Sequence, residues 1–423
     1  MSRRRLTGRI AAGTLATGLL LAACGSPGSS SSSPSTPATA ATAATAAGGG
    51  SAGASAEPAT GEPIKVGVVT SLSGPLQSYG QMYLDAFNVC LDHATNGTGA
   101  VNGRPIAVAT ADDAGDPAKA TTAATDYIGQ GYQILAGSAS SGVALQVAPL
   151  AQENQVLFIS GPAATDAITG VNKYTFRSGR QTYQDIATAA SFVGDLQGKK
   201  VTIFAQDSAF GQANVAAASA VFGAEGATVT PLLVPATATD LVPFAKQAAD
   251  ADPDLLFVAW AGTNATQMWE AMGQQGAFDG TTVVTGLDIK PTHTVFAPVA
   301  DKLSLLAHYF DGATDNEVEQ ALVAGLAAEG KTQDLFSPDG CNAALMVVRA
   351  AGESPDDVDG MITALEGWEF EGPKGTTTIR AEDHAMLQPM FQTKLVDVNG
   401  TLTPELVKEL APADTAPAPK QFQ

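Results

Sequence analysis

Histidine, cysteine and basic residues are all scarce in this sequence, and each shortage narrows the functions that fit it. The four histidines, His93, His293, His308 and His384, show no metal-ligand spacing, so we expect solvated or capping roles for them and no metal site. Lysine and arginine total 22 against 42 acidic residues, for a formal net charge of −20. Such acidity does not favour nucleic-acid binding. The three cysteines form no Cys-x-x-Cys pair, and we predict no cofactor.

No hydrophobic run reaches the length of a membrane-spanning helix, and the longest apolar run lies at the N-terminus. Several arginines precede an apolar run over residues 10–23, which is shorter than the ~20 residues of a membrane-spanning helix. This pattern predicts a signal peptide over residues 1–23. Leu21-Ala22-Ala23-Cys24 resembles a bacterial lipobox, so we expect Cys24 to carry the lipid. The predicted location is the outer face of the cell membrane, with export by either the Sec or the twin-arginine route.

Composition divides the rest of the chain. Residues 24–61 are almost entirely Ser, Pro, Thr, Ala and Gly, which is typical of a flexible linker. Residues 62–411 are long enough for two lobes and a sizeable core. Residues 412–423 have the composition of a disordered tail.

From Ile64 onward, short β-branched runs alternate with segments of helical period, which predicts an α/β fold with parallel sheets covered by helices. A single parallel sheet of this length would be unusual, so we expect two doubly wound lobes. The strand-like run that ends at Arg177 gives way to a polar segment before Asp185, and we place the first change of lobe there. Cys90 falls on the apolar face of the first helix and is expected to be buried.

Two loops of small residues follow predicted strands and are the candidate ligand site. Gly137–Gly142 follows an apolar run and opens a helix, and Ser160–Thr165 follows the next strand. Backbone amides at a helix N-terminus carry partial positive charge and bind anions without a basic side chain. Either loop alone fits a tight strand-to-helix connection equally well. Their pairing on neighbouring strands favours a ligand site.

Two other features stay ambiguous from the residues alone. Asp112 and Asp113 suggest paired catalytic carboxylates, but adjacent residues at a strand end point in opposite directions, which favours a structural role in the loop. Cys90 and Cys341 are candidates for a disulfide in an exported protein, and two separately buried thiols fit as well.

Several short motifs, taken in order, resemble those of a known family: the leucine/isoleucine/valine-type substrate-binding lipoproteins of ABC transporters, with the type I periplasmic-binding-protein fold. The similarity is strongest over residues 64–288 and comes after a lipobox. The motifs that carry it are Ser73-Gly74-Pro75 with Tyr79-Gly80, the segment from Asn96 to Ile106, Asp112 to Pro117, Gly161 to Thr165, and Phe210-Gly211.

The resemblance implies two lobes joined by a three-crossing hinge that close on a ligand. Lobe I would comprise about 62–180 plus about 290–370, and lobe II about 181–289 plus a C-terminal segment. Ser141 and nearby amides would bind an α-carboxylate, while Ala163, Thr165 and Asp288 would receive the ammonium group. The implied ligand-binding residues are Tyr79, Ala139, Ser140, Ser141, Ala163, Ala164, Thr165, Phe210, Trp260, Ala261 and Asp288.

The sequence departs from its relatives at several of these positions. Relatives often have tyrosine at Phe210, an aromatic residue at Ala261 and glutamate at Asp288. Some have a disulfide between the positions of Gly115 and Ser140, which is missing here, and we expect Cys90 and Cys341 to bridge instead. These departures leave the ligand open among hydrophobic amino acids, amides or urea, and aromatic carboxylates.

The resemblance implies transport and no enzyme activity. The expected partners are a small-molecule ligand, the membrane subunits of an ABC permease and, through Cys24, the membrane itself, with the protein as a monomer. A ligand-binding sensor is the alternative, although sensors of this fold usually carry a transmembrane segment and a signalling domain.

Overall fold

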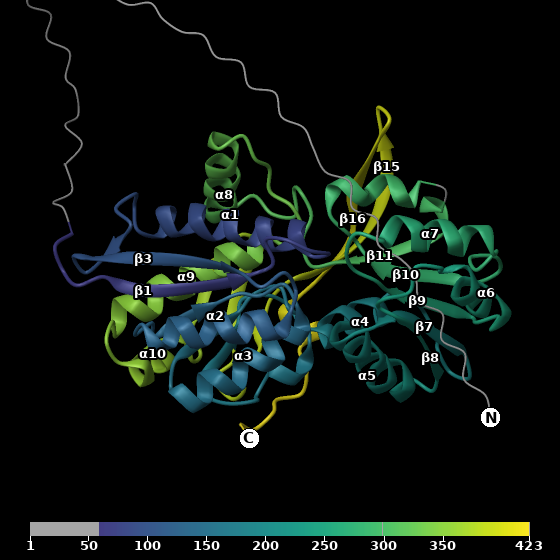
Figure 1. The fold of residues 1–423 in the computed structure, drawn as a ribbon. Coiled ribbons are helices and arrows are strands. Elements are labelled where there is room, and N and C mark those ends of the chain that lie inside the picture. Colours follow the sequence, from purple (N-terminus) through teal and green to yellow (C-terminus); the bar gives the residue numbers. More distant parts are fainter. Residues whose placement is uncertain (1–58, 298, 423) are drawn as a thin grey trace, which may run out of the picture. The chain divides into compact units, whose positions relative to one another are not determined.

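Two mostly parallel sheets organise the chain in the computed structural model, which describes residues 59–297 and 299–422 (Figure 1). The predicted signal peptide, Cys24 and nearly all of the linker lie outside these residues. Gly61, which we predicted to belong to the linker, already donates a hydrogen bond from its amide to the carbonyl of Gly103. Within the described part of the chain, no helix combines the length and apolar character needed to cross a bilayer.

The first sheet has six strands in the order β2-β3-β1-β4-β5-β6, all parallel except β2. Helices from both early and late parts of the sequence pack on it. The strands are β1 (Ile64–Thr70), β2 (Ala100–Val101), β3 (Arg104–Asp112), β4 (Ile134–Ala136), β5 (Leu157–Ser160) and β6 (Thr175–Arg177). The helices are α1 (Gln77–Ala94), α2 (Pro117–Gly129), α3 (Ser141–Asn154), α8 (Glu317–Ala328), α9 (Ser337–Glu353) and α10 (Val358–Leu365).

The second sheet has seven strands in the order β16-β15-β11-β10-β9-β7-β8. Its first five strands in sequence are parallel, and β15 and β16 add an antiparallel hairpin at one edge. The strands are β7 (Lys200–Asp207), β8 (Thr228–Pro235), β9 (Leu255–Ala259), β10 (Thr282–Gly286), β11 (Leu303–Ala307), β15 (Met390–Val398) and β16 (Thr401–Leu410). The helices are α4 (Thr182–Ala190), α5 (Ala209–Ala224), α6 (Val242–Asp250) and α7 (Ala265–Gln274).

The chain passes between the two sheets three times, after β6, after β11 and after β14 (Met386–Leu387). This architecture confirms the predicted fold class of two doubly wound lobes. The predicted return to lobe I near residue 290 is wrong, because β11 still pairs with β10 in the second sheet. Two 3-10 turns between β10 and β11 obscured that strand in the sequence pattern. β14 belongs to a small antiparallel sheet with β12 (Glu369–Gly372) and β13 (Gly375–Ile379).

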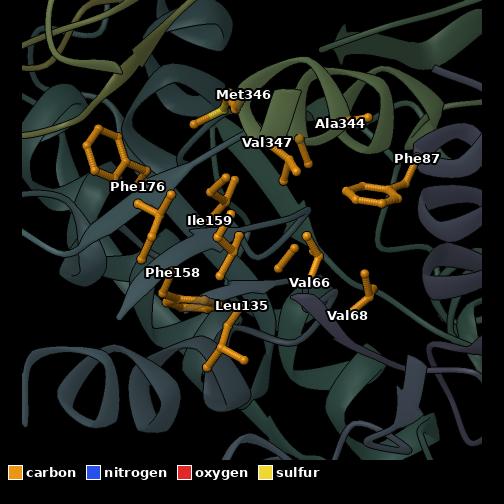
Figure 2. Close-up of a cluster of buried hydrophobic side chains, with 14 of the residues drawn as sticks. Val66, Val68, Phe87, Leu135, Phe158, Ile159, Phe176, Ala344, Met346 and Val347 are labelled. Atoms are coloured by element: carbon orange, nitrogen blue, oxygen red, sulfur yellow. The ribbon is translucent and has the colours of Figure 1, made fainter. Parts of the chain in front are cut away.

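The core of the first lobe lies between its sheet and the late helix α9. Alternate residues of each strand face opposite sides, as the period of two requires. Val66 and Ile159 face Val347 of α9, whereas Leu135 and Phe158 lie on the other side of the sheet (Figure 2). All of these side chains are at most 2% exposed. The late segment of the chain is therefore an integral part of the first lobe.

The structure also bonds Cys90 of α1 to Cys341 of α9, with 5.0 Å between their Cα atoms. Both cysteines are fully buried. Next to this bridge the two helices approach so closely that a Cβ on Gly340 would lie 2.0 Å from the carbonyl oxygen of Tyr83. The bridge is thus the pairing that the family resemblance led us to expect.

The predicted disordered tail is ordered from residue 412 to residue 422, so that prediction is wrong. It begins with a 3-10 turn, Pro412–Thr415. Arg380 then donates a hydrogen bond to the carbonyl of Pro417 at 2.7 Å, and Asp383 accepts one from the amide of Lys420 at 3.0 Å. The composition of these residues is typical of disorder, but the ion pair Arg380–Asp383 supplies polar partners for their backbone.

Candidate functional site

A cavity of about 440 Å³ lies where the carboxyl ends of the strands of both sheets meet. Its walls come from loops that follow β1, β3, β4, β5 and β6 of the first lobe and β7, β8 and β9 of the second. This position and this size are typical of small-molecule sites in α/β proteins. Seven of the predicted residues line it: Tyr79, Ala139, Ser140, Ser141, Ala164, Phe210 and Ala261.

Asp113 holds the loops of the first lobe together beneath the cavity. Its fully buried carboxylate accepts hydrogen bonds from the hydroxyls of Ser71 and Ser138, both at 2.6 Å, and from the amide of Gly115. These partners belong to three different loops after β1, β3 and β4. The neighbouring Asp112 caps the loop after β1 through Ser73, and these hydrogen bonds lower its pKa. Both carboxylates therefore have the structural role that we predicted.

The two loops of small residues lie together, as we predicted from their neighbouring strands. Ser140 caps α3, with its hydroxyl accepting from the amide of Val143. The hydroxyl of Ser141 accepts from the amide of Thr165 at 3.3 Å, which joins the two loops directly. The first turn of α3 therefore points its amides into the cavity beside Ser141.

Two of the predicted ammonium acceptors do not reach the larger cavity. Ala163 is fully buried and Thr165 is 3% exposed, and neither lines it. Their carbonyl oxygens accept from the guanidinium of Arg177, at 3.3 Å and 2.8 Å. The hydroxyl of Thr165 accepts from Ala167 at the start of a 3-10 turn. The Ala163 carbonyl and the Thr165 hydroxyl, which we assigned to a ligand ammonium, thus both accept hydrogen bonds from within the protein.

Asp288, the third predicted acceptor, also misses the larger cavity. It lines a smaller space of about 70 Å³, together with Trp260. The hydroxyl of Tyr79 donates to the Asp288 carboxylate at 2.8 Å, and the amide of Ile289 donates to the same oxygen. Burial raises the pKa of Asp288 and raises that of Tyr79 well above its usual value. Tyr79 also accepts from the amide of Gly262, so this tyrosine links the two lobes.

The second-lobe wall combines an aromatic ring with amides. Phe210 stands at the start of α5, and the side chain of Gln206 accepts from the amide of Ala261 at 3.3 Å. The side-chain amide oxygen of Asn264 accepts from the indole nitrogen of Trp260 at 2.9 Å. Trp260 stacks on Phe204 and lines only the smaller space. This predicted ligand-binding residue therefore does not border the larger cavity.

Sequence reasoning missed several residues of the wall, among them Arg180 and Phe336. Arg180 follows β6 at the first crossing and is 7% exposed. Its guanidinium donates to the carbonyl of Pro162 at 2.9 Å, pairs with Asp185 at 3.3 Å and lies over the Phe336 ring, 5.9 Å from its centroid. A cation placed directly after a strand that ends at a crossing was the available signal for Arg180. Phe336 gave none, because it precedes a helix far along the chain.

A glycine follows the site aromatic residue in each lobe, and in both cases it permits a close approach of the backbone. A Cβ on Gly80, after Tyr79, would lie 2.0 Å from the carbonyl oxygen of Ser71. A Cβ on Gly211, after Phe210, would lie 1.8 Å from the carbonyl oxygen of Gln206. The glycines thus let the first turn of each helix pack on the end of the preceding strand, which brings the aromatic ring to the cavity.

The histidines correct one of our predictions. His293, His308 and His384 are at most 4% exposed, so they are not solvated, and His308 borders the smaller space. His293 contacts the carbonyl of Asp288 at 2.8 Å, and His384 lies between Thr175 and Glu366. Among residues 59–297 and 299–422, no group of His, Cys, Asp and Glu side chains is arranged to hold a metal ion.

One segment matches the sequence pattern of a phosphate-binding loop but has a different structure. Residues 325–332 fit the Gly-x-x-x-x-Gly-Lys-Thr pattern of phosphate-binding loops. That pattern requires a strand before the loop and a helix after it. Here Gly325 lies inside α8, where a Cβ would meet the side chain of Val89 at 2.3 Å. The segment is therefore the end of a packed helix and is no phosphate-binding loop.

Comparison with known proteins identifies a family of binding proteins. A family model described as periplasmic binding protein matches residues 63–400. A Leu/Ile/Val-binding protein of Rhizobium johnstonii is 25% identical over 346 residues, covering 74% of this chain and 87% of the relative. The crystal structure of an ABC-type branched-chain amino acid transporter from Rhodopseudomonas palustris is 31% identical, with a TM-score of 0.70 and coverage of 85% and 100%. An ABC transporter solute-binding protein from R. palustris in complex with 4-hydroxybenzoate shares the fold, with 23% identity, a TM-score of 0.75 and coverage of 82% and 97%.

Proposed function

This chain belongs to the periplasmic binding protein family, and from that premise we propose that it captures a small organic solute and delivers it to the membrane subunits of an ABC importer. The observation that carries this proposal is the cavity between the two lobes, which is lined from the strand ends of both sheets. The members that resemble it are binding proteins rather than enzymes.

The proposed solute has a carboxylate and an apolar body. Ser141 and the first amides of α3 supply donors for a carboxylate, and the rings of Tyr79, Phe210 and Phe336 supply an apolar wall. A hydrophobic amino acid or an aromatic carboxylate has these two parts. The names of the relatives favour the first, and the complex with 4-hydroxybenzoate favours the second.

The proposed mechanism is capture by closure of the lobes. Contacts between the lobes already run through the hydroxyl of Tyr79, which meets Asp288 and the amide of Gly262. A solute that touches both walls adds contacts that exist only in the closed state, so it shifts the population toward closure. The permease would then recognise the closed form.

The proposed setting is the outer face of the cell membrane. Residues 1–23 have the pattern of a signal peptide, and Cys24 occupies the lipidated position of a lipobox. A lipid on Cys24 would tether the binding protein near its permease through the linker. Mass spectrometry of the purified mature N-terminus tests this: a diacylglyceryl cysteine is expected, and an unmodified Cys24 or an uncleaved signal would contradict it.

A thermal-shift screen of the mature protein tests the proposed function. The panel contains hydrophobic amino acids, short amides, urea, and aliphatic and aromatic carboxylates. Binding to the native state alone raises the unfolding midpoint by mass action, so at least one carboxylate-containing member should raise it in a saturable way. If urea or an amide alone raised the midpoint, the carboxylate class would be wrong. If nothing on the panel did so, capture of a small organic solute would be contradicted.

A further inference from the structure

Arg180 is the only charged residue that lines the larger cavity among the residues that the structure describes. This is unexpected in a chain with 42 acidic and 22 basic residues. The rest of the wall consists of Ala, Gly, Pro, Ser and Thr residues, aromatic rings, one leucine and two amide side chains. The cavity therefore offers a cation, and no acidic side chain of the described part of the chain lines it.

The guanidinium of Arg180 retains a free donor. Its Nη1 donates to the carbonyl of Pro162, and its Nε faces the carboxylate of Asp185. No partner of Nη2 is found in residues 59–297 and 299–422. Because the side chain is 91% buried and borders the cavity, a solute is the natural acceptor for the two N–H groups of Nη2.

A second set of donors lies on the same cavity. The amides of Ser141 and Gly142 begin α3 and make no hydrogen bond to any described residue. Amides at the start of a 14-residue helix carry the positive end of its dipole. Arg180 follows β6 and these amides follow β4, so two independent elements present donors to one space.

No anionic acceptor for an ammonium group lines this cavity among residues 59–297 and 299–422. The carbonyls of Ala163 and Thr165 are bound to Arg177, whose own positive charge lies behind them. The Asp288 carboxylate is bound to Tyr79 and Ile289 and borders only the smaller space. An α-ammonium group brought into the larger cavity would lose its water without gaining an anion.

We propose that the solute is a carboxylate without an α-ammonium group, and that Arg180 is the residue that selects it. This rests on the proposed function, because it names the class of solute that the same cavity takes. The carboxylate lies between Nη2 of Arg180 and the first amides of α3. The apolar body of the solute packs against Tyr79, Phe210 and Phe336. The ring centroids of Tyr79 and Phe336 are 4.5 Å apart.

Matched solutes on the unmodified mature protein test the selection. We choose 3-phenylpropanoate, L-phenylalanine and 3-phenylpropanamide, which share one apolar body, and measure Kd by isothermal titration calorimetry. The carboxylate should bind at least roughly tenfold more tightly than either of the others. L-phenylalanine binding as tightly as 3-phenylpropanoate overturns the proposal and leaves the proposed function intact. Absence of binding by all three, and by 4-methylpentanoate and L-leucine, overturns both.

Substitution at the arginine tests the role of Arg180 itself. Arg180→Gln alone leaves Asp185 buried without its cation, so it is combined with Asp185→Asn. We expect the double variant to lose roughly 100-fold in affinity for 3-phenylpropanoate and to keep its affinity for 3-phenylpropanamide, which reports on folding. Arg349→Gln is the matched control, because Arg349 also lies over an aromatic ring, that of Trp368, away from the cavity.

Equal loss for the carboxylate and the amide assigns Arg180 a structural role and overturns its part in selection. Unchanged affinity for both does the same. If the double variant does not fold, Arg180→Lys keeps the charge but loses the planar fork, and its expected loss is confined to the carboxylate. A loss shared by the amide in Arg180→Lys again overturns the selection.

Discussion

Gly211 offers the sharpest test of how the fold positions the site. It follows Phe210 in the first turn of α5, and a Cβ there would lie 1.8 Å from the carbonyl oxygen of Gln206. That carbonyl belongs to β7, whose pairing with β8 and β9 holds it in place. The exposed Gly223, near the other end of α5, has nothing within 4 Å of such a Cβ. Gly211→Ala and Gly223→Ala therefore make the same chemical change on one helix in two different surroundings.

The expected magnitudes follow from these surroundings. Both changes remove the conformational entropy of a glycine, which stabilises a helix by about 0.5–1 kcal/mol. At Gly211 the helix must also move by more than an ångström against a strand, and overpacking of this kind costs about 1–3 kcal/mol or more. The two variants should thus differ by about 3 kcal/mol. For roughly 360 folded residues, this corresponds to a difference of about 4 °C in unfolding midpoint.

Differential scanning calorimetry of the two variants measures this difference, and calorimetric titration with the solute from the screen measures its effect on the site. We expect Gly223→Ala to match or exceed the parent protein in stability with unchanged affinity. Gly211→Ala should melt lower and bind at least roughly tenfold more weakly, since the displaced helix moves Phe210. A Gly211→Ala protein as stable as Gly223→Ala, with unchanged affinity, would refute the role of this glycine.

Three further predictions concern the scaffold. Burial raises the pKa of Glu319 to about 7, with one of its oxygens unpartnered and the other accepting from Tyr309. The resulting stabilisation is complete below the unfolded-state pKa of ~4.5 and is lost as the pH rises through ~7. The urea midpoint should therefore fall from pH 5 to pH 8, and Glu319→Gln should make this fall smaller. An unchanged pH dependence in Glu319→Gln would contradict the raised pKa. Replacing Cys90 and Cys341 together by alanine should lower the free energy of unfolding by about 2–5 kcal/mol, because the bridge closes a loop with a sequence separation of 251; a urea melt that matches that of the parent protein would argue against the bridge. Deletion of residues 417–423 removes the partners of Arg380 and Asp383 and should cost about 1–2 kcal/mol, with faster amide exchange around Asp383; exchange equal to the parent would mean that the tail does not pack there.

The sequence predicted the fold well because its signals were local. Strands such as Ile64–Thr70 and helices such as Gln77–Ala94 each carry their own apolar period, and the parallel order follows from their alternation. The prediction failed where the decisive partner was distant. The local pattern around Leu303–Ala307 does not show a strand, and only its pairing with β10 defines one. The C-terminal tail has the composition of a disordered segment, and only its contacts with Arg380 and Asp383 order it.

Some of the predicted site residues also line the cavity, whereas others do not, and further residues of its wall were missed. The resemblance assigned Ser141 and Phe210 to the site, and both lie on loops that follow strands and line the cavity. Ala163 and Thr165 were assigned by resemblance, and nothing local showed that Arg177 would bind their carbonyls. Arg180 was missed because its importance depends on which other charges face the cavity, and that follows only from the tertiary fold.

A crystal structure of the mature protein with the solute that raises its unfolding midpoint most is the most direct measurement. We predict one solute molecule between the lobes, in contact with Tyr79, Phe210 and Phe336. Its carboxylate should lie about 3 Å from the first amides of α3 and from Nη2 of Arg180. A solute bound outside this cavity, or a cavity left without it at a saturating concentration, would contradict the proposed function.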